Sequence, residues 1–179
     1  MNLNGVIKII ETLQKSSKVP HNMTNYSKIS LEFFQKIDKY LGLSDSRYGE
    51  NEWVISLPEN NPIGKDFIFL DYYNDIIKLV IEFYGDYWHG NPKIYDVDDY
   101  IDFPNKERKS VAEIWSQDSI RENYIKEYLR PNFFYIVWES EQEKMLKTIV
   151  QDVNKLKVIS YPDENRIYNE EQDKDKDLD

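Results

Sequence analysis

Apolar and polar residues alternate along this chain in patterns that predict both helices and strands. Apolar positions recur every three to four residues in three segments, which predicts helices over residues 27–41, 110–129 and 145–156. Ser27 is the expected N-cap of the first helix. Short apolar runs bounded by turn residues predict strands over residues 52–57, 66–73, 79–84 and 133–138. Residues 6–14 fit either a short strand or the first turns of a helix.

The order of these elements predicts an α/β fold. Three consecutive strands with short links favour an antiparallel meander, and a helix before the last strand favours parallel pairing of that strand. We expect one domain over residues 1–162, in which the structure of residues 1–26 is left open. Residues 163–179 carry eight acidic and three basic side chains without apolar periodicity, which predicts a disordered acidic tail.

Two carboxylates interrupt the apolar pattern of neighbouring strands. Asp71 lies in the run from Asp66 to Tyr73, and Glu82 lies in the run from Leu79 to Tyr84. Burial of a carboxylate is costly unless it is paired or binds a metal. Since the two runs are joined by a short turn, Asp71 and Glu82 are expected near each other, where their repulsion raises one pKa or attracts a divalent cation.

Two further residues that are candidates for a role in chemistry follow the Glu82 strand. His89 lies in the turn directly after it, and Asp118 occupies a position on the apolar face of the predicted helix over 110–129. Asp118 could be an acid at the edge of that face, paired with Arg121 or Arg130 of its own helix.

These residues resemble a known nuclease family. The segment IEFYGDYWHGNP, preceded by the strand with Asp71 and followed by a helix and the strand FFYIVWES, resembles the very-short-patch-repair endonuclease branch of the PD-(D/E)XK nucleases. That branch includes homing-type relatives with an E…D…H…D constellation. The resemblance runs from about Glu52 to Glu139. It implies a restriction-endonuclease-like fold, a mixed sheet of about four strands flanked by helices, and metal-dependent hydrolysis of DNA phosphodiester bonds.

The resemblance also implies roles for the four residues. Asp71 would bind Mg²⁺ or Mn²⁺, and Glu82 would ligate the metal or hold a metal-bound water. His89 would accept a proton from the attacking water. Asp118 would orient His89 or ligate a second metal. The lysine of the family pattern is missing, since Tyr84 stands two residues after Glu82.

Other candidates follow from the same resemblance with the alternatives left open. Glu32 and Glu52 are candidate acids near the metal, although either could be an ordinary surface glutamate. Trp88 is expected in the core, with base stacking as the alternative. Residues 91–109 are long for a structureless connection, which predicts a binding loop or a mobile segment, and their aspartates are expected to be solvated. The candidate DNA-contacting cations are Lys106, Arg108, Lys109 and Arg121.

Net charge and cysteine content modify this interpretation. The chain has a formal net charge of −10, which opposes binding to DNA, and the acidic residues concentrate in 51–104 and 163–179. A rival interpretation is therefore a catalytically inactive nuclease-fold protein that binds DNA or a protein partner. The chain has no cysteine, so we expect none of the structural zinc found in the repair endonucleases. With no leader-like or long apolar segment, we expect an intracellular, soluble protein, cytoplasmic or nuclear depending on the host, and no membrane partner.

Overall fold

A mixed four-stranded sheet forms the centre of the protein, described here from a computed structural model that covers residues 26–160. The strand order is β1 (Arg47–Ser56), β2 (Phe67–Asn74), β3 (Leu79–Tyr84) and β6 (Phe133–Trp138). The first three pair antiparallel, and β3 pairs parallel with β6. The meander and the parallel last strand predicted from the sequence are therefore confirmed. The expectations for residues 6–14, for the N-terminal extension and for the acidic tail lie outside the described residues.

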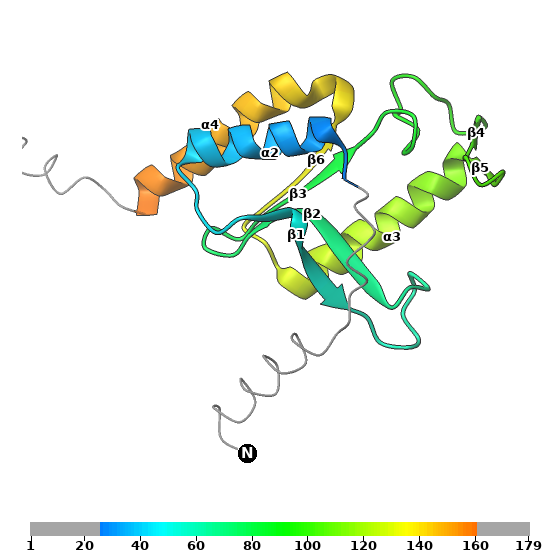
Figure 1. The fold of residues 1–179 in the computed structure, drawn as a ribbon, viewed down its shortest axis with the longest axis horizontal. Helices are drawn as coiled ribbons and strands as arrows, with labels where there is room; N and C mark the ends of the chain where they lie inside the picture. Colours follow the sequence, from blue (N-terminus) through cyan, green and yellow to red (C-terminus); the bar gives the residue numbers. More distant parts are fainter. Residues whose placement is uncertain (1–25, 161–179) are drawn as a thin grey trace, which may run out of the picture.

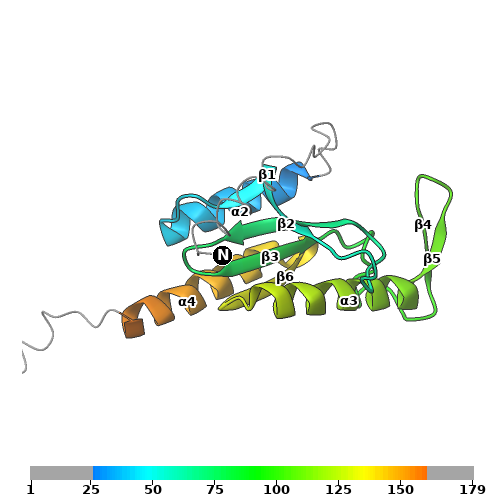
Figure 2. The same cartoon turned by 90° about the horizontal axis from the view of Figure 1, so that it is seen from below.

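Helices cover both faces of this sheet (Figures 1 and 2). On one face lie α2 (Lys28–Leu41) and α4 (Gln142–Ser160), and on the other lies α3 (Val111–Leu129). The short 3-10 helix η1 (Glu139–Glu141) joins β6 to α4. The α/β class and the helix-flanked sheet are confirmed.

The side chains of β3 point alternately to the two faces of the sheet and so pack against different helices. Leu79, Ile81 and Phe83 pack into the core with α2 and α4, because successive strand side chains point to opposite faces. Val80 packs toward Ile125 of α3. Glu82 therefore points to the α3 side, in a strand that is buried along its whole length.

Local sequence explains how α2 and α3 begin. The Ser27 side chain accepts the Ser30 N–H at 3.0 Å, as the sequence predicts for an N-cap. Ser110 caps α3 in a capping box, where Glu113 N–H donates to the Ser110 hydroxyl and the Glu113 carboxylate accepts from the Ser110 backbone. Both caps fix where the helices start relative to the sheet.

The structure corrects two expectations, namely where the first strand begins and that residues 91–109 form a loop. β1 begins at Arg47 instead of Glu52, and its register with β2 shifts between Tyr48 and Trp53. Residues 91–109 are not without structure, because β4 (Tyr100–Asp102) and β5 (Arg108–Ser110) pair as a hairpin that projects from the start of α3 (Figure 2). β6 is largely half-buried because it forms an edge of the sheet.

Candidate active site

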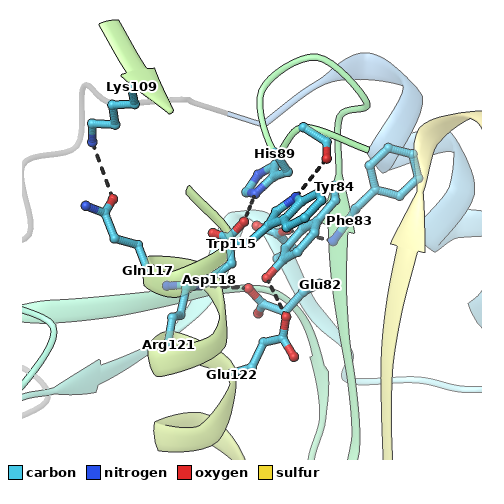
Figure 3. Close-up of polar contacts among 12 residues, drawn as sticks. Glu82, Phe83, Tyr84, His89, Lys109, Trp115, Gln117, Asp118, Arg121 and Glu122 are labelled. Carbon is cyan, nitrogen blue, oxygen red and sulfur yellow. Dashed lines mark hydrogen bonds and ion pairs between the residues drawn. The ribbon is translucent and has the colours of Figure 1, made fainter. Parts of the chain in front are cut away.

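The candidate site lies where β3 ends, between the turn that carries His89 and the middle of α3 (Figure 3). The turn is closed by backbone bonds from His89 N–H to Gly85 O at 3.1 Å and from Asn91 N–H to Asp86 O at 2.8 Å. The buried Asn91 side chain also donates to the Asp86 carboxylate at 2.6 Å. Asp86 therefore serves the shape of the turn, which presents His89 toward α3.

The turn is also tied directly to α3. Trp115 donates its indole N–H to Gly90 O at 2.8 Å. Gly90 adopts a φ of +59°, and a Cβ atom there would lie 3.1 Å from Val111. Glycine is the residue that combines this backbone angle with so close a neighbour. The contact holds His89 at a fixed distance from the helix.

His89 and Asp118 form the clearest functional pair of the site. His89 Nδ1 lies 2.8 Å from Asp118 Oδ2, and the two side chains are 30% and 16% exposed. Tyr84 stacks on the imidazole with ring centroids 3.9 Å apart and planes 3° apart. A carboxylate only accepts hydrogen bonds, so Nδ1 donates and Nε2 is left to accept a proton.

The second pair joins Glu82 to Arg121. The guanidinium donates to Glu82 Oε2 from Nε at 2.9 Å and from Nη2 at 2.6 Å. Burial of Glu82 and the neighbouring Asp71 carboxylate raise the pKa of Glu82 to about 8, although Arg121 opposes the shift. Within residues 26–160, Glu82 Oε1 is a buried oxygen without a hydrogen-bond partner. This oxygen is therefore available to a ligand or a proton.

Asp71 links Glu82 to a third carboxylate, that of Glu52. Asp71 Oδ2 accepts the Phe83 backbone N–H at 2.8 Å, while burial raises the pKa of Asp71. Burial and the Asp71 charge also raise the pKa of Glu52 to about 7. Glu52, Asp71 and Glu82, hereafter the carboxylate cluster, are thus electrostatically coupled, because a nearby negative charge disfavours ionisation of each member.

The donor chemistry of the carboxylate cluster fits a hard divalent cation. Its atoms are carboxylate oxygens, and Glu82 Oε1 is both buried and unpartnered. Among residues 26–160, no three His, Asp or Glu side chains are grouped closely enough to hold an ion by themselves. Mg²⁺ usually keeps several waters and binds one or two protein carboxylates, so a site for it would not need a third protein ligand.

The metal-free protein is expected to lose stability as the pH rises from 5 to 8. The pKa of Glu82 is about 8 and that of Glu52 about 7 in the folded protein, against an ordinary value of 4.5. The folded state therefore binds more protons than the unfolded chain in this window, so stability falls as pH rises. Glu82 contributes a loss on the order of 3 kcal/mol, with a smaller part from the more exposed Glu52.

Urea unfolding in EDTA at pH 5.5 and pH 8 measures this difference. The Glu82→Gln variant is the control, because it cannot ionise and should lose most of the pH dependence. Stability that stays level or rises between the two pH values in the wild-type protein would contradict the assignment of a buried, proton-binding Glu82.

An open cavity of about 320 Å³ lies next to the His89–Asp118 pair. Asp118 lines it, as does Tyr84, which stacks on His89 and donates its hydroxyl to Glu122 Oε1 at 3.2 Å. The other lining residues are mostly apolar: Pro92, Trp115, Ile136 and Trp138, with Ser119 and Glu122 as the polar ones. The cavity gives a flat, largely apolar group a way to approach Asp118.

The structure places several sequence candidates away from this site. Glu32 lies on the solvent face of α2, 3.8 Å from Lys28, because the apolar face of the helix turns the opposite way toward the sheet. The expectation that Trp88 is a core residue was wrong, since it is 47% exposed and contacts Tyr87 and Phe103. The acidic residues of 96–102 are exposed, as expected for solvated aspartates.

The candidate DNA-contacting cations divide between two places. Lys106, Arg108 and Lys109 lie on the β4–β5 hairpin, where Arg108 also covers the Tyr100 ring at 4.7 Å. Arg121 instead points inward to Glu82. The residue pattern did not predict this pairing. Its one signal was that Arg121 follows Asp118 by three residues and so lies on the same helix face, which was expected to be turned inward.

None of the helices in residues 26–160 has the length and apolar character that crossing a bilayer requires. Comparison with known protein families, with characterised proteins and with solved structures finds no match to this chain.

Proposed function

We propose that the protein is a metal-dependent DNA endonuclease with a restriction-endonuclease-like fold, related to the very-short-patch-repair enzymes. The observation that carries the proposal is the 2.8 Å bond between His89 and Asp118 beside buried, coupled carboxylates on adjacent strands. A base held by a carboxylate next to oxygen ligands for a divalent cation is what hydrolysis of a phosphodiester requires. The order α2, β1, β2, β3, α3, β6 supports the fold assignment.

In the proposed reaction His89 is the general base. Asp118 holds the imidazole with Nδ1 protonated, so Nε2 takes a proton from the attacking water as the new oxygen–phosphorus bond forms. The bond from phosphorus to the leaving sugar oxygen then breaks, that oxygen takes up a proton from solvent water, and His89 returns its proton to solvent. Stacking on Tyr84 keeps the ring from turning away.

Asp71 and Glu82 would hold Mg²⁺ or Mn²⁺ in this proposal. When bound, the metal would neutralise the charge that develops on the phosphate oxygens. Asp71 is itself held by the Phe83 N–H, which leaves its second oxygen for a ligand. Glu52 is the remaining acid of the cluster and would add negative charge beside the ion.

The experiment that tests the function is a cleavage assay of supercoiled plasmid and of linear duplex with the purified wild-type chain. Cleavage is expected with Mg²⁺ or Mn²⁺ and none with EDTA. The double variant Asp71→Asn, His89→Ala is the control for a contaminating nuclease. Metal-dependent cleavage equal in the wild type and the double variant, or no cleavage of any DNA tested, would reject the proposal.

The β4–β5 hairpin is the proposed DNA-docking element, because it projects from α3 and carries Lys106, Arg108 and Lys109 (Figure 2). Replacing these three residues with Gln is expected to weaken non-specific duplex binding. The slope of log K, the association constant, against log salt concentration should become shallower by about 2 to 3. Fluorescence anisotropy across a salt series measures both quantities.

A matched control removes the cations of α2. The triple variant Lys28→Gln, Lys36→Gln, Lys39→Gln changes the net charge equally on another element. If it lowers duplex affinity and the salt dependence as much as the hairpin variant does, the effect is one of net charge and the hairpin is not the docking element.

A non-catalytic protein that binds DNA or another protein is the second candidate. Its support is the net charge of −10 and the pairing of Glu82 with Arg121 in place of an open ligand set. The same assay separates the two candidates, because this one predicts no metal-dependent cleavage by the wild type.

A further inference from the structure

Arg121 is directed into the protein from the middle of α3 (Figure 3). Its Nε and Nη2 atoms both donate to Glu82 Oε2, and Nη2 also donates to the Phe69 carbonyl oxygen at 2.6 Å. The side chain is 22% exposed, while that of Glu82 is 1% exposed. Because the guanidinium is fixed by groups of both β2 and β3, it is an internal part of the site and no free surface cation.

The bonds from Arg121 satisfy only half of the Glu82 carboxylate. Both N–H groups converge on Oε2, and Oε1 stays buried without a partner among the described residues. A buried charged oxygen without a donor or cation carries a desolvation cost. The arrangement therefore fixes the carboxylate by one oxygen and leaves the other available.

The charges around Arg121 do not balance. One guanidinium lies beside the three acids of the carboxylate cluster, and it hydrogen-bonds only one of them, Glu82. When the cluster is ionised, a negative charge is left over that a divalent cation can offset. The guanidinium and such a cation would then share the same carboxylates.

We infer that Arg121 is a positioning residue of the metal site and that its guanidinium gives the site a permanent positive charge. It orients Glu82 so that Oε1 is left for the metal, and its charge limits how tightly the site retains a divalent ion. This inference rests on the metal site of the proposed function. The inference adds Arg121 to the residues of the proposed site, which are Asp71, Glu82 and His89.

The sign of the effect follows from the charges. A metal ion bound at Glu82 carries two positive charges and repels the guanidinium beside it. Removal of the positive charge takes this repulsion away, so metal affinity rises.

The test is Mn²⁺ binding to the full, DNA-free chain, followed by electron paramagnetic resonance. Arg121→Gln, which keeps an N–H donor but removes the charge, is expected to bind Mn²⁺ at least about tenfold more tightly than the wild type, or about 1.4 kcal/mol. Arg121→Lys, which keeps the charge, is expected to stay within about threefold of the wild type, less than about 0.7 kcal/mol. Lys126→Gln removes a cation at the exposed side of the same helix and is the matched control, with no change expected.

Unchanged or weaker Mn²⁺ binding by Arg121→Gln would overturn the inference, and so would equal tightening in Arg121→Lys. A purely structural Arg121 would lower the melting temperature of both variants without tightening Mn²⁺ binding. If Arg121→Gln does not fold, the wild-type Arg121 Nε–H resonance is followed in a Mg²⁺ titration. A shift that saturates supports the inference, and no shift overturns it.

The result of the Mn²⁺ binding test is independent of the cleavage assay, because the binding test contains no DNA. A wild-type chain that fails to cleave DNA but shows the expected order of Mn²⁺ affinities leaves the inference standing and rejects the nuclease. Absence of Mn²⁺ binding in every variant overturns the inference.

Discussion

The Asp71→Asn variant is expected to lose metal-dependent DNA cleavage entirely. The substitution removes a carboxylate from the proposed metal site while its amide oxygen can still accept the Phe83 N–H. Loss of the charge stabilisation that a metal supplies is worth several kcal/mol, which lowers the rate by on the order of 10³ or more. Single-turnover cleavage of a labelled duplex with saturating Mg²⁺ measures the loss.

The same variant should make the metal-free protein more stable. Burial raises the pKa of Asp71, which shows that its ionised form is disfavoured in the fold. Replacement by a neutral amide is expected to raise the free energy of unfolding in EDTA at pH 8, because the amide carries no charge to desolvate. Asp66→Asn, an exposed residue just before the same strand, is the control for both measurements. Wild-type cleavage by Asp71→Asn would remove Asp71 from the site.

The His89→Ala variant is expected to cleave DNA more slowly by a factor of about 10² to 10⁴, the usual contribution of a general base. Its affinity for duplex DNA should stay close to that of the wild type, because the imidazole is neither a surface cation nor part of the hairpin. Single-turnover rates and anisotropy on the same oligonucleotide separate the two effects. Cleavage at the wild-type rate would show that another group takes the proton.

Asp118→Asn distinguishes an oriented base from a second metal ligand. An amide oxygen in place of Asp118 Oδ2 can still accept from His89 Nδ1, so the ring stays in position but loses the neighbouring negative charge. A rate between those of the wild type and His89→Ala, with unchanged Mn²⁺ affinity, is expected for orientation. Weaker Mn²⁺ binding would instead identify Asp118 as a metal ligand.

Only part of the candidate site could be predicted from the residue pattern. Asp71 and Glu82 could be selected because each interrupts an apolar strand, and the short connection between the strands placed them near each other. His89 could be selected because it follows directly after the Glu82 strand. Strand alternation requires Glu82 and Leu79 to lie on opposite faces of the sheet, and they do.

Other parts of the site depended on contacts between distant residues. Glu52 lies near Asp71 because β1 pairs antiparallel with β2 in a register that sets Trp53 opposite Leu70, and no local periodicity reveals that register. Glu32 was a candidate by its position on an N-terminal helix, but the packing of that helix leaves it in solvent. The β4–β5 hairpin has strands of only three residues, too short for alternation to show.

The sequence by itself determined the order of the central helices and strands, the antiparallel and parallel pairing, and the strand face on which Glu82 lies, because these follow from short-range periodicity and connection length. Only the tertiary structure decided which charges pair. Asp118 could have bonded Arg121 within its own helix, yet it bonds His89, and Arg121 bonds Glu82 from 39 positions away. The physical reason is burial: a buried carboxylate gains most from a nearby cation, and burial is a property of the packed chain.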